Sequence, residues 1–249
     1  MIKQSVAFWC FNSLEPEEFF SKAYEIGYRG IEMVPAKHRA LARQIGLEVI
    51  NHNCGQIEVG LNKVINHEKL IPVYQQGIRQ IAVDGIEQLI VFCGNRDGQL
   101  DAEGLANTID GFKKIITFAE ENNVVLTLEL FNQEDHPDYL GDQTKFGIDL
   151  CREVNSPNLK ILYDVYHMAK QNQNLLKDLV ENLDLIGHLH LAAKNKRSCT
   201  ADCEEIPYKE IVSCFHRVGY RGYWGQEFIV TDNLIDELKR SYDFIAACE

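Results

Sequence analysis

Short apolar runs rich in β-branched and aromatic residues alternate with longer amphipathic stretches along the whole chain. The runs predict eight strands, at residues 5–11, 30–34, 47–53, 88–94, 124–131, 159–165, 185–192 and 222–229. Between the runs, apolar positions recur at helical spacing, as in residues 15–27, where Pro16 suits the first turn and Gly27 suits the C-terminal end. This alternation is typical of repeated βα units that build a parallel sheet.

Eight βα units predict an α/β fold of the (β/α)₈ class, a TIM barrel. The chain has 249 residues, of which 45% are apolar, and this is enough for one such core. Since no Ser-, Gly- or Pro-rich linker interrupts the series, we expect a single domain over residues 1–249. The helix after residues 30–34 is the weakest element, because it begins with proline and is short. The sequence contains neither GxGxxG after its first strand nor GxxxxGK[ST], which disfavours an open nucleotide-binding sheet.

The charge balance narrows the range of partners. Lys and Arg number 25 against 37 Asp and Glu, so the net charge is −12, and we expect no nucleic-acid partner. Because no secretory signal and no long apolar run is present, we expect no membrane partner and a cytoplasmic location. The eight cysteines have no framework spacing, and Cys199 and Cys203 are one residue too far apart for a CxxC motif. We interpret them as reduced thiols.

Four consecutive predicted strands end in groups that can bind a metal ion. They are Glu129, Asp164, His190 and Glu227, in predicted strands five to eight. In a (β/α)₈ barrel the C-terminal ends of the strands form the active face. The four side chains are therefore expected to surround one point.

Three carboxylates and one imidazole suit a hard or borderline divalent cation. We predict one ion, Mn²⁺, Mg²⁺ or Co²⁺, with its remaining positions open to water or to substrate oxygens. The ion also gives a physical reason for the arrangement, because three buried carboxylates without a cation would repel one another.

Asp164, His190 and Glu227 also have simpler structural explanations, whereas Glu129 lies between apolar neighbours, where an unpaired carboxylate would cost several kcal/mol. Asp164 is suited to cap a helix, and Glu227 to pair with a buried arginine such as Arg221. His188 and His190 alternate with apolar residues, so both point to the same face of their strand. We assign His190 to the metal because it lies nearer the C-terminal end. His188 is then a buried support for the ligand, or a group that orients substrate oxygens.

The segments TLELFN, LYDVYHM, IGHLHLA and GYWGQEF, in this order and spacing, resemble the xylose-isomerase-like TIM-barrel superfamily. The similarity is greatest to hydroxypyruvate isomerases and their relatives, followed by ketose 3-epimerases. The resemblance implies that the four predicted ligands hold the metal and that Glu129 and Glu227 are also the catalytic proton-transfer groups. It further implies that His167 contacts substrate oxygens and that Arg197 reaches the substrate from the loop after strand seven.

The resemblance predicts a metal-dependent isomerase that interconverts a small aldose and ketose, or a hydroxy-keto acid, through an enediolate. A ketose 3-epimerase is the main alternative, because His190 stands where hydroxypyruvate isomerases commonly have glutamine. An inositol-pathway dehydratase or isomerase, and a catalytically silent metal-binding barrel, also stay open. An apurinic endonuclease is opposed by the charge of −12. By analogy with other barrels of this kind, homo-oligomerisation is a further open expectation.

Overall fold

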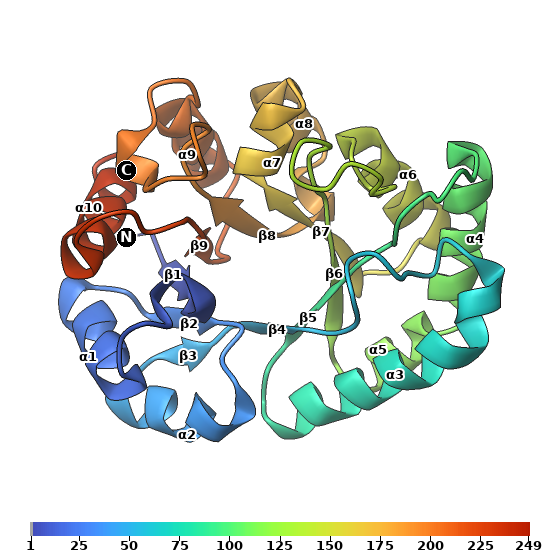
Figure 1. Ribbon diagram of the computed structural model, residues 1–249, viewed down its shortest axis with the longest axis horizontal. Helices are drawn as coiled ribbons and strands as arrows, with labels where there is room; N and C mark the ends of the chain where they lie inside the picture. The colour runs from blue at the N-terminus through green and yellow to red at the C-terminus, as the bar shows by residue number, and fades with distance from the viewer. Residues whose placement is uncertain (1) are drawn as a thin grey trace. The chain divides into compact units, whose positions relative to one another are not determined.

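The computed structural model describes residues 2–249, and its elements follow the predicted alternation (Figure 1). The strands are β1 (Gln4–Ala7), β2 (Gly30–Glu32), β3 (Glu48–Val49), β4 (Asn51–Asn53), β5 (Gln88–Val91), β6 (Val125–Glu129), β7 (Leu159–Asp164), β8 (Ile186–Leu191) and β9 (Trp224–Gln226). The α-helices are α1 (Pro16–Ile26), α2 (Ala36–Ile45), α3 (Val64–Val83), α4 (Asp101–Lys113), α5 (Ile116–Glu121), α6 (Thr144–Val154), α7 (Val165–Lys170), α8 (Leu175–Glu181), α9 (Tyr208–Arg217) and α10 (Leu234–Ala246). Three short 3₁₀ helices are η1 (Phe8–Phe11), η2 (Leu183–Leu185) and η3 (Thr200–Asp202).

The described residues form two compact units. The first unit comprises the residues up to Asn51, Asn174–Glu181 and His188–Glu249. The second unit comprises His52–Gln173 and Asn182–Gly187. The organisation of residues 1–249 as one domain stays a prediction.

The first unit contains parallel strands in the order β3-β2-β1-β9-β8. Helices α1 and α10 come from opposite ends of the chain and lie side by side (Figure 1). The buried Tyr28 joins them, because its hydroxyl donates to the carbonyl of Leu238 at 3.0 Å and lies 2.9 Å from the Ser241 hydroxyl. This long-range contact closes the first unit between its N- and C-terminal segments.

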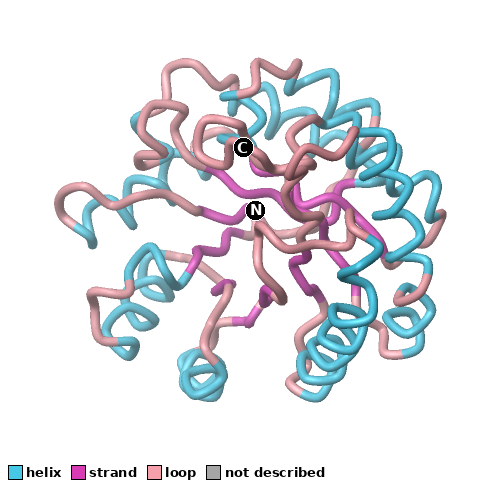
Figure 2. The backbone as a smooth tube through the Cα atoms, turned by 45° about the vertical axis from the view of Figure 1, so that its right-hand side comes forward, coloured by secondary structure: helices cyan, strands magenta, loops and turns pink. Residues whose placement is uncertain are grey.

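The second unit contains strands in the order β7-β6-β5-β4, of which β7, β6 and β5 pair in parallel. Its strands lie inside a layer of helices, which Figure 2 shows in cyan around magenta strands. Helix α6 has a buried apolar stripe that packs on β7. Residue Glu129, at the end of β6, is paired in register with Leu162 of β7. Parallel register of this kind brings the C-terminal ends of β6 and β7 to one edge.

Some elements of the structure differ in extent from those expected from the sequence. The first strand ends at Ala7, because Phe8–Phe11 turns into the 3₁₀ helix η1. The third predicted strand is divided into β3 and β4. Residues 101–121 form two helices, because the chain is interrupted after Lys113, where the amides of Lys114 and Ile115 donate to carbonyls three residues back. The helix after residues 30–34, expected to be the weakest, is a regular α2 of ten residues.

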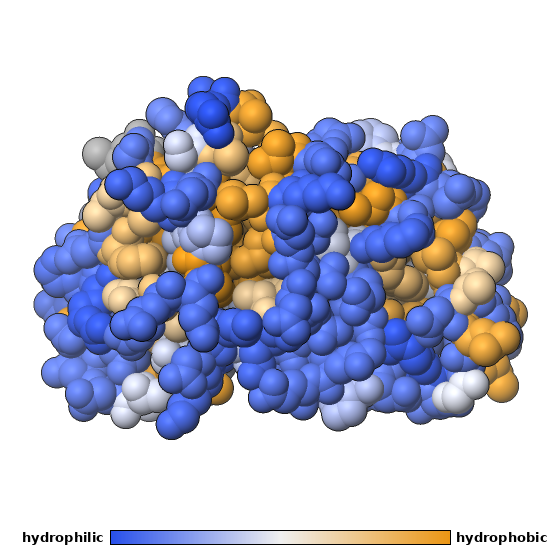
Figure 3. Space-filling model, turned by 90° about the horizontal axis from the view of Figure 1, so that it is seen from above, coloured by the Kyte–Doolittle hydropathy of each residue, from blue (hydrophilic) through white to orange (hydrophobic). Residues whose placement is uncertain are grey.

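Surface and cysteine features agree with the sequence analysis. All eight cysteines are free, as expected for reduced thiols. Hydrophilic residues cover much of the face drawn in Figure 3, in keeping with the net charge of −12. Among residues 2–249, each helix is either too short or too polar to cross a lipid bilayer.

Candidate active site

Two buried carboxylates end neighbouring strands of the second unit. Glu129 is the last residue of β6 and Asp164 is the last residue of β7, and their exposed fractions are 5% and 1%. One carboxylate oxygen of each lies within 4.8 Å of the other. Two like charges this close in a buried environment favour a shared cation or proton. The sequence prediction that these strand ends carry metal-competent carboxylates is consistent with this geometry.

Asp164 also starts the helix that follows it. Its Oδ1 accepts a hydrogen bond from the backbone N–H of His167 at 3.1 Å, so it is the N-cap of α7. Its Oδ2 lies 3.7 Å from His167 Nε2. The two roles that the sequence suggested for Asp164 are thus compatible, because one oxygen caps the helix while the other faces the histidine.

The ring of His167 is fully buried among aromatic side chains. Phe131 and Tyr166 pack against it edge to face, with ring centroids 4.8 and 5.0 Å away. The His167 Nδ1 atom accepts from the backbone N–H of Asn132 at 3.2 Å and lies 2.6 Å from the Asn132 side-chain nitrogen. Because Nδ1 is the acceptor, Nε2 carries the proton of the neutral ring. His167 therefore presents a hydrogen-bond donor on the side of Asp164.

In the first unit, the ends of β2, β8 and β9 bring together a second group of buried side chains. We call it the histidine–carboxylate cluster, and it consists of Glu32, His188, His190 and Glu227. His190 Nε2 lies 2.9 Å from Glu32 Oε2, and His190 Nδ1 lies 2.8 Å from Glu227 Oε2. His190 thus stands between two carboxylates, one at each ring nitrogen.

Glu227 is bound by three different donor groups. The indole Nε1 of Trp9 donates to Oε1 at 2.8 Å, and Arg197 Nη2 donates to Oε2, which His190 also approaches. Burial raises the pKa of Glu227, but the nearby His190 and Arg197 outweigh it and hold that pKa well below its usual range. Glu227 is therefore ionised at neutral pH.

Arg197 is the arginine partner of Glu227, not Arg221. The Arg221 guanidinium instead donates to the carbonyl of Tyr220 at 3.3 Å. The loop that carries Arg197 is anchored by the amide of Ile229, which donates to the Arg197 carbonyl at 2.8 Å. The guanidinium lies over the Trp9 ring, 5.8 Å from its centroid, and the side chain is only 14% exposed. Arg197 therefore packs with the buried side chains around Glu227, although it belongs to the charged segment KNKR of residues 194–197.

His188 lies deeper than His190 in the cluster. Its Nε2 is 2.9 Å from Glu32 Oε2, and its buried Nδ1 has no hydrogen-bond partner within residues 2–249. This placement fits a supporting role next to His190. Substrate binding by His167, His188 and Arg197 stays a prediction.

Sequence analysis missed Glu32 and Asn132, and it did not foresee the hydrogen bond from Trp9 to Glu227. Glu32 ends the apolar strand β2, so the rule that singled out the four later strand ends would also have found it. Asn132 follows TLELF directly, but nothing in its position shows that it would meet His167, 35 residues later.

The four residues predicted to hold one ion are divided between the units. Glu129 and Asp164 belong to the second unit, and His190 and Glu227 belong to the first. Within each unit the two residues are neighbours, as the sequence analysis expected. Their joint binding of one ion stays a prediction.

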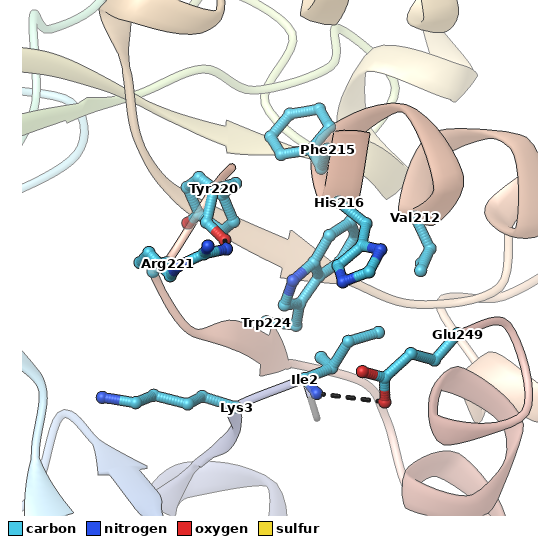
Figure 4. Close-up of a pocket in the computed structure, with 10 residues that line it drawn as sticks. Ile2, Lys3, Val212, Phe215, His216, Tyr220, Arg221, Trp224 and Glu249 are labelled. Carbon is cyan, nitrogen blue, oxygen red and sulfur yellow. Dashed lines mark hydrogen bonds between the residues drawn. The ribbon is translucent and has the colours of Figure 1, made fainter. Parts of the chain in front are cut away.

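A cavity of about 270 Å³ in the first unit lies at the other end of the strands (Figure 4). It is lined by Lys3 and Trp224, next to the N-terminal ends of β1 and β9. At the edge of this cavity, the Glu249 carboxylate accepts a hydrogen bond from the backbone N–H of Ile2, at 3.3 Å. Because Glu227 follows the C-terminal end of β9, the cavity is not part of the histidine–carboxylate cluster.

Comparison with known proteins confirms the predicted fold class. A family model described as a xylose isomerase-like TIM barrel matches residues 20–248. The crystal structure of an AP endonuclease, family 2, from Brucella melitensis superimposes with a TM-score of 0.85 at 20% identity, covering 96% of this chain and 97% of that one. At this identity, the structural likeness concerns the fold alone.

The sequence relatives include an isomerase and an epimerase. Hydroxypyruvate isomerase from Escherichia coli (strain K12) is 24% identical over 222 residues, which cover 84% of this chain and 86% of that protein. D-psicose 3-epimerase from Enterocloster bolteae is 28% identical over 131 residues, which cover 53% of this chain and 41% of the epimerase. The chain is thus similar to an isomerase over most of its length and to an epimerase over about half.

Proposed function

Because this chain belongs to the xylose isomerase-like TIM-barrel family, we propose that it is a metal-dependent enzyme that isomerises or epimerises a small hydroxy-carbonyl compound. The observation that carries the proposal is the burial of ionisable groups at the C-terminal strand ends, where barrels of this class place their active sites. The names of the two sequence relatives, an isomerase and an epimerase, support this reaction class.

The side chains fit a divalent cation. Nε2 of His190 faces a carboxylate that accepts hydrogen bonds, so Nε2 carries a proton, and a cation at Nδ1 would replace the ring proton that faces Glu227. Nδ1 and the ionised Glu227 Oε2, only 2.8 Å apart, would then both donate electron pairs to that cation. Glu129 and Asp164 supply a second pair of donors. Three carboxylates and one imidazole suit Mn²⁺, Mg²⁺ or Co²⁺, and we propose that these four residues hold one such ion.

We assign proton transfer to the two glutamates of this set. The bound ion would supply Lewis-acid polarisation of the substrate carbonyl. Glu227, kept ionised by Arg197 and by the Trp9 indole, is suited to take a proton from the carbon that carries a substrate hydroxyl. Glu129 is suited to return a proton to a neighbouring carbon or to the opposite face. His167, with its Nε2–H fixed by Asn132, would donate a hydrogen bond to a substrate oxygen.

Isomerisation and epimerisation need the same residues and differ in where the proton returns. Return of the proton to the neighbouring carbon interconverts an aldose and a ketose. Its return to the opposite face of the same carbon inverts the configuration of that carbon. We place hydroxypyruvate-like isomerisation first, because the isomerase match covers 84% of this chain and the epimerase match covers 53%.

A test of the proposal is proton exchange with solvent. The purified protein, loaded with Mn²⁺, would be incubated in deuterated water with hydroxypyruvate, D-psicose and other small ketoses, and each compound would be analysed by ¹H NMR. We expect deuterium to enter at a carbon next to the carbonyl in at least one compound. Hydroxypyruvate converting to its aldehyde isomer would identify the isomerase, and inversion at C3 of a ketose would identify the epimerase.

Two results would count against the proposal. If the Mn²⁺-loaded protein exchanged no proton in any compound, the barrel would be a metal-binding module without this chemistry. If a substrate instead lost water, as shown by a mass 18 units lower, the reaction would be a dehydration of the inositol-pathway type.

The Trp9→Phe substitution tests the contact between Trp9 and Glu227. Phenylalanine keeps an aromatic ring beneath Arg197 but removes the indole donor to Glu227 Oε1. Since a hydrogen bond to a charged group contributes roughly 1.5–3 kcal/mol, and water can partly replace this one at a residue that is 37% exposed, we expect kcat/KM to fall about tenfold. Loss of a donor to the ionised form also raises the pKa of Glu227, so the acid limb of the kcat/KM profile should move to higher pH.

The Trp224→Phe variant is the matched control. Trp224 is buried in the same unit, at the opposite end of β9 from Glu227, among Phe215 and Tyr220. It should lower the melting temperature without moving the acid limb. An unchanged acid limb in the Trp9→Phe enzyme would show that the indole donor does not influence Glu227.

A further inference from the structure

Glu32 is a buried carboxylate that belongs to none of the four proposed metal ligands. It is the last residue of β2, is 0% exposed, and lies at the centre of the histidine–carboxylate cluster. Side-chain donors surround this carboxylate, so it acts toward its neighbours as a hydrogen-bond acceptor.

Both oxygens of Glu32 are occupied by protein donors. Oε1 accepts from the Ser5 hydroxyl at 2.5 Å. Oε2 lies 2.5 Å from the Asn51 side-chain nitrogen and 2.9 Å from Nε2 of both His188 and His190. Because a carboxylate has about four lone-pair sites, Glu32 has little capacity left to bind an ion itself. Its chemistry is that of a support for neighbouring side chains.

The two histidines are oriented by this one carboxylate. Their rings are nearly perpendicular, at 86°, with centroids 5.2 Å apart, so both can direct Nε2 to the same oxygen. The Asn51 side-chain nitrogen can only donate to Glu32 Oε2, so this oxygen is an acceptor and each Nε2 that approaches it must carry a proton. For His190, this leaves Nδ1 on the side of Glu227, at 2.8 Å from its Oε2.

A glycine on the adjacent strand makes room for the arrangement. Gly225 of β9 is paired in register with Ser5 of β1 and with His190 of β8. A Cβ atom at this position would collide with Glu32 Oε1 and would lie 3.0 Å from His188 Nε2. Any other residue at position 225 would thus displace the carboxylate or the ring, which shows that the backbone of β9 is fitted to Glu32.

We propose that Glu32 is the positioning residue of the metal centre, holding the Nε2–H of His190 so that Nδ1 is the metal-binding atom. The inference rests on the proposed metal site and adds to it the tautomer of the histidine and the group that fixes it. A carboxylate that accepts the second ring proton of a ligand histidine fixes the orientation of the ring and increases its basicity. Removal of such a partner typically weakens metal affinity by 10- to 100-fold.

The experiment compares Mn²⁺ binding by the wild-type protein and by the Glu32→Gln variant, using isothermal titration calorimetry. Glutamine keeps the shape but removes the charge and one acceptor oxygen, so we expect the Mn²⁺ dissociation constant to rise by roughly 10- to 100-fold. Glu237→Gln is the matched control. Glu237 is a buried carboxylate of the same unit, which accepts from the amides of Thr231 and Asp232 and is not part of the cluster. Its loss should lower the melting temperature and leave Mn²⁺ affinity unchanged.

A second measurement does not depend on the folding of a variant. The ¹⁵N shifts of His190 in wild-type protein loaded with diamagnetic Mg²⁺ or Zn²⁺, assigned by their loss in His190→Gln, should show the proton on Nε2 and the metal on Nδ1. Glu32→Gln binding Mn²⁺ as tightly as the wild type, or a proton found on Nδ1, would overturn the role of Glu32. Wild-type protein that binds none of these ions would overturn the metal centre itself, so the two failures can be told apart.

Discussion

The Glu129→Gln and Glu227→Gln proteins are expected to be folded and to have lost proton exchange with solvent. Each substitution keeps the volume of the side chain and removes its ability to take up a proton. General acid–base transfer contributes roughly 10² to 10⁴-fold to a rate, and we expect deuterium incorporation to fall by at least that factor. The measurement is the initial rate of deuterium entry into the substrate identified above, with circular dichroism to show that the fold is kept.

Metal content must be measured for the same two variants. A glutamine oxygen can still bind a cation, so a variant that retains Mn²⁺ but exchanges no proton separates the transfer step from metal binding. Lys22 and Glu25 form an exposed ion pair on α1, and the Glu25→Gln protein is a control that should exchange protons at the wild-type rate. An active Glu227→Gln enzyme would refute the proton-transfer role given to that residue.

Removal of the metal is expected to have the second largest effect. Dialysis against a chelator should abolish deuterium exchange, and Mn²⁺ should restore it. A ligand at 100 times its dissociation constant stabilises the folded state by about 2.7 kcal/mol. For a chain of this size, each kcal/mol corresponds to about 2–4 °C in melting temperature. We therefore expect Mn²⁺ to raise the melting temperature of the metal-free protein by about 5–11 °C.

The Asp164→Asn protein is the control for this shift. Asparagine caps a helix about as well as aspartate, so α7, whose first turn donates the His167 backbone N–H to the side chain of residue 164, should be kept. The negative charge offered to the ion is lost, and the Mn²⁺-dependent shift should shrink or disappear. Exchange that continues in fully chelated protein would contradict metal dependence.

The sequence predicted the elements well where their signal is local. Short apolar runs rich in β-branched and aromatic residues located every strand of residues 2–249, because such runs depend only on neighbours in the chain. The aromatic run Phe8–Phe11 has high β-propensity, yet it forms a 3₁₀ helix in which Phe11 packs on Phe19 and Phe228. Contacts with residues distant in the sequence decided the conformation of that segment. The β-propensity of its residues carries no information about such contacts.

The candidate site shows the same division. The periodicity of the strands placed Glu129, Asp164, His190 and Glu227 at strand ends, since a strand end can be read from the sequence alone. The arginine that pairs with Glu227 could not be read in this way. Arg221 is nearer in sequence, but Arg197, 30 residues away, makes the contact because its loop is tied to Ile229.

The sequence by itself determined on which elements the candidate residues lie and which chemical groups end the later strands. Only the tertiary structure decided how these groups are paired. His188 and His190 lie on the same face of β8, and the sequence cannot tell which ring nitrogen of either points inward. Glu32, separated from His190 by 158 positions, fixes the orientation of both rings. Its buried carboxylate accepts a hydrogen bond from the Nε2–H of each histidine.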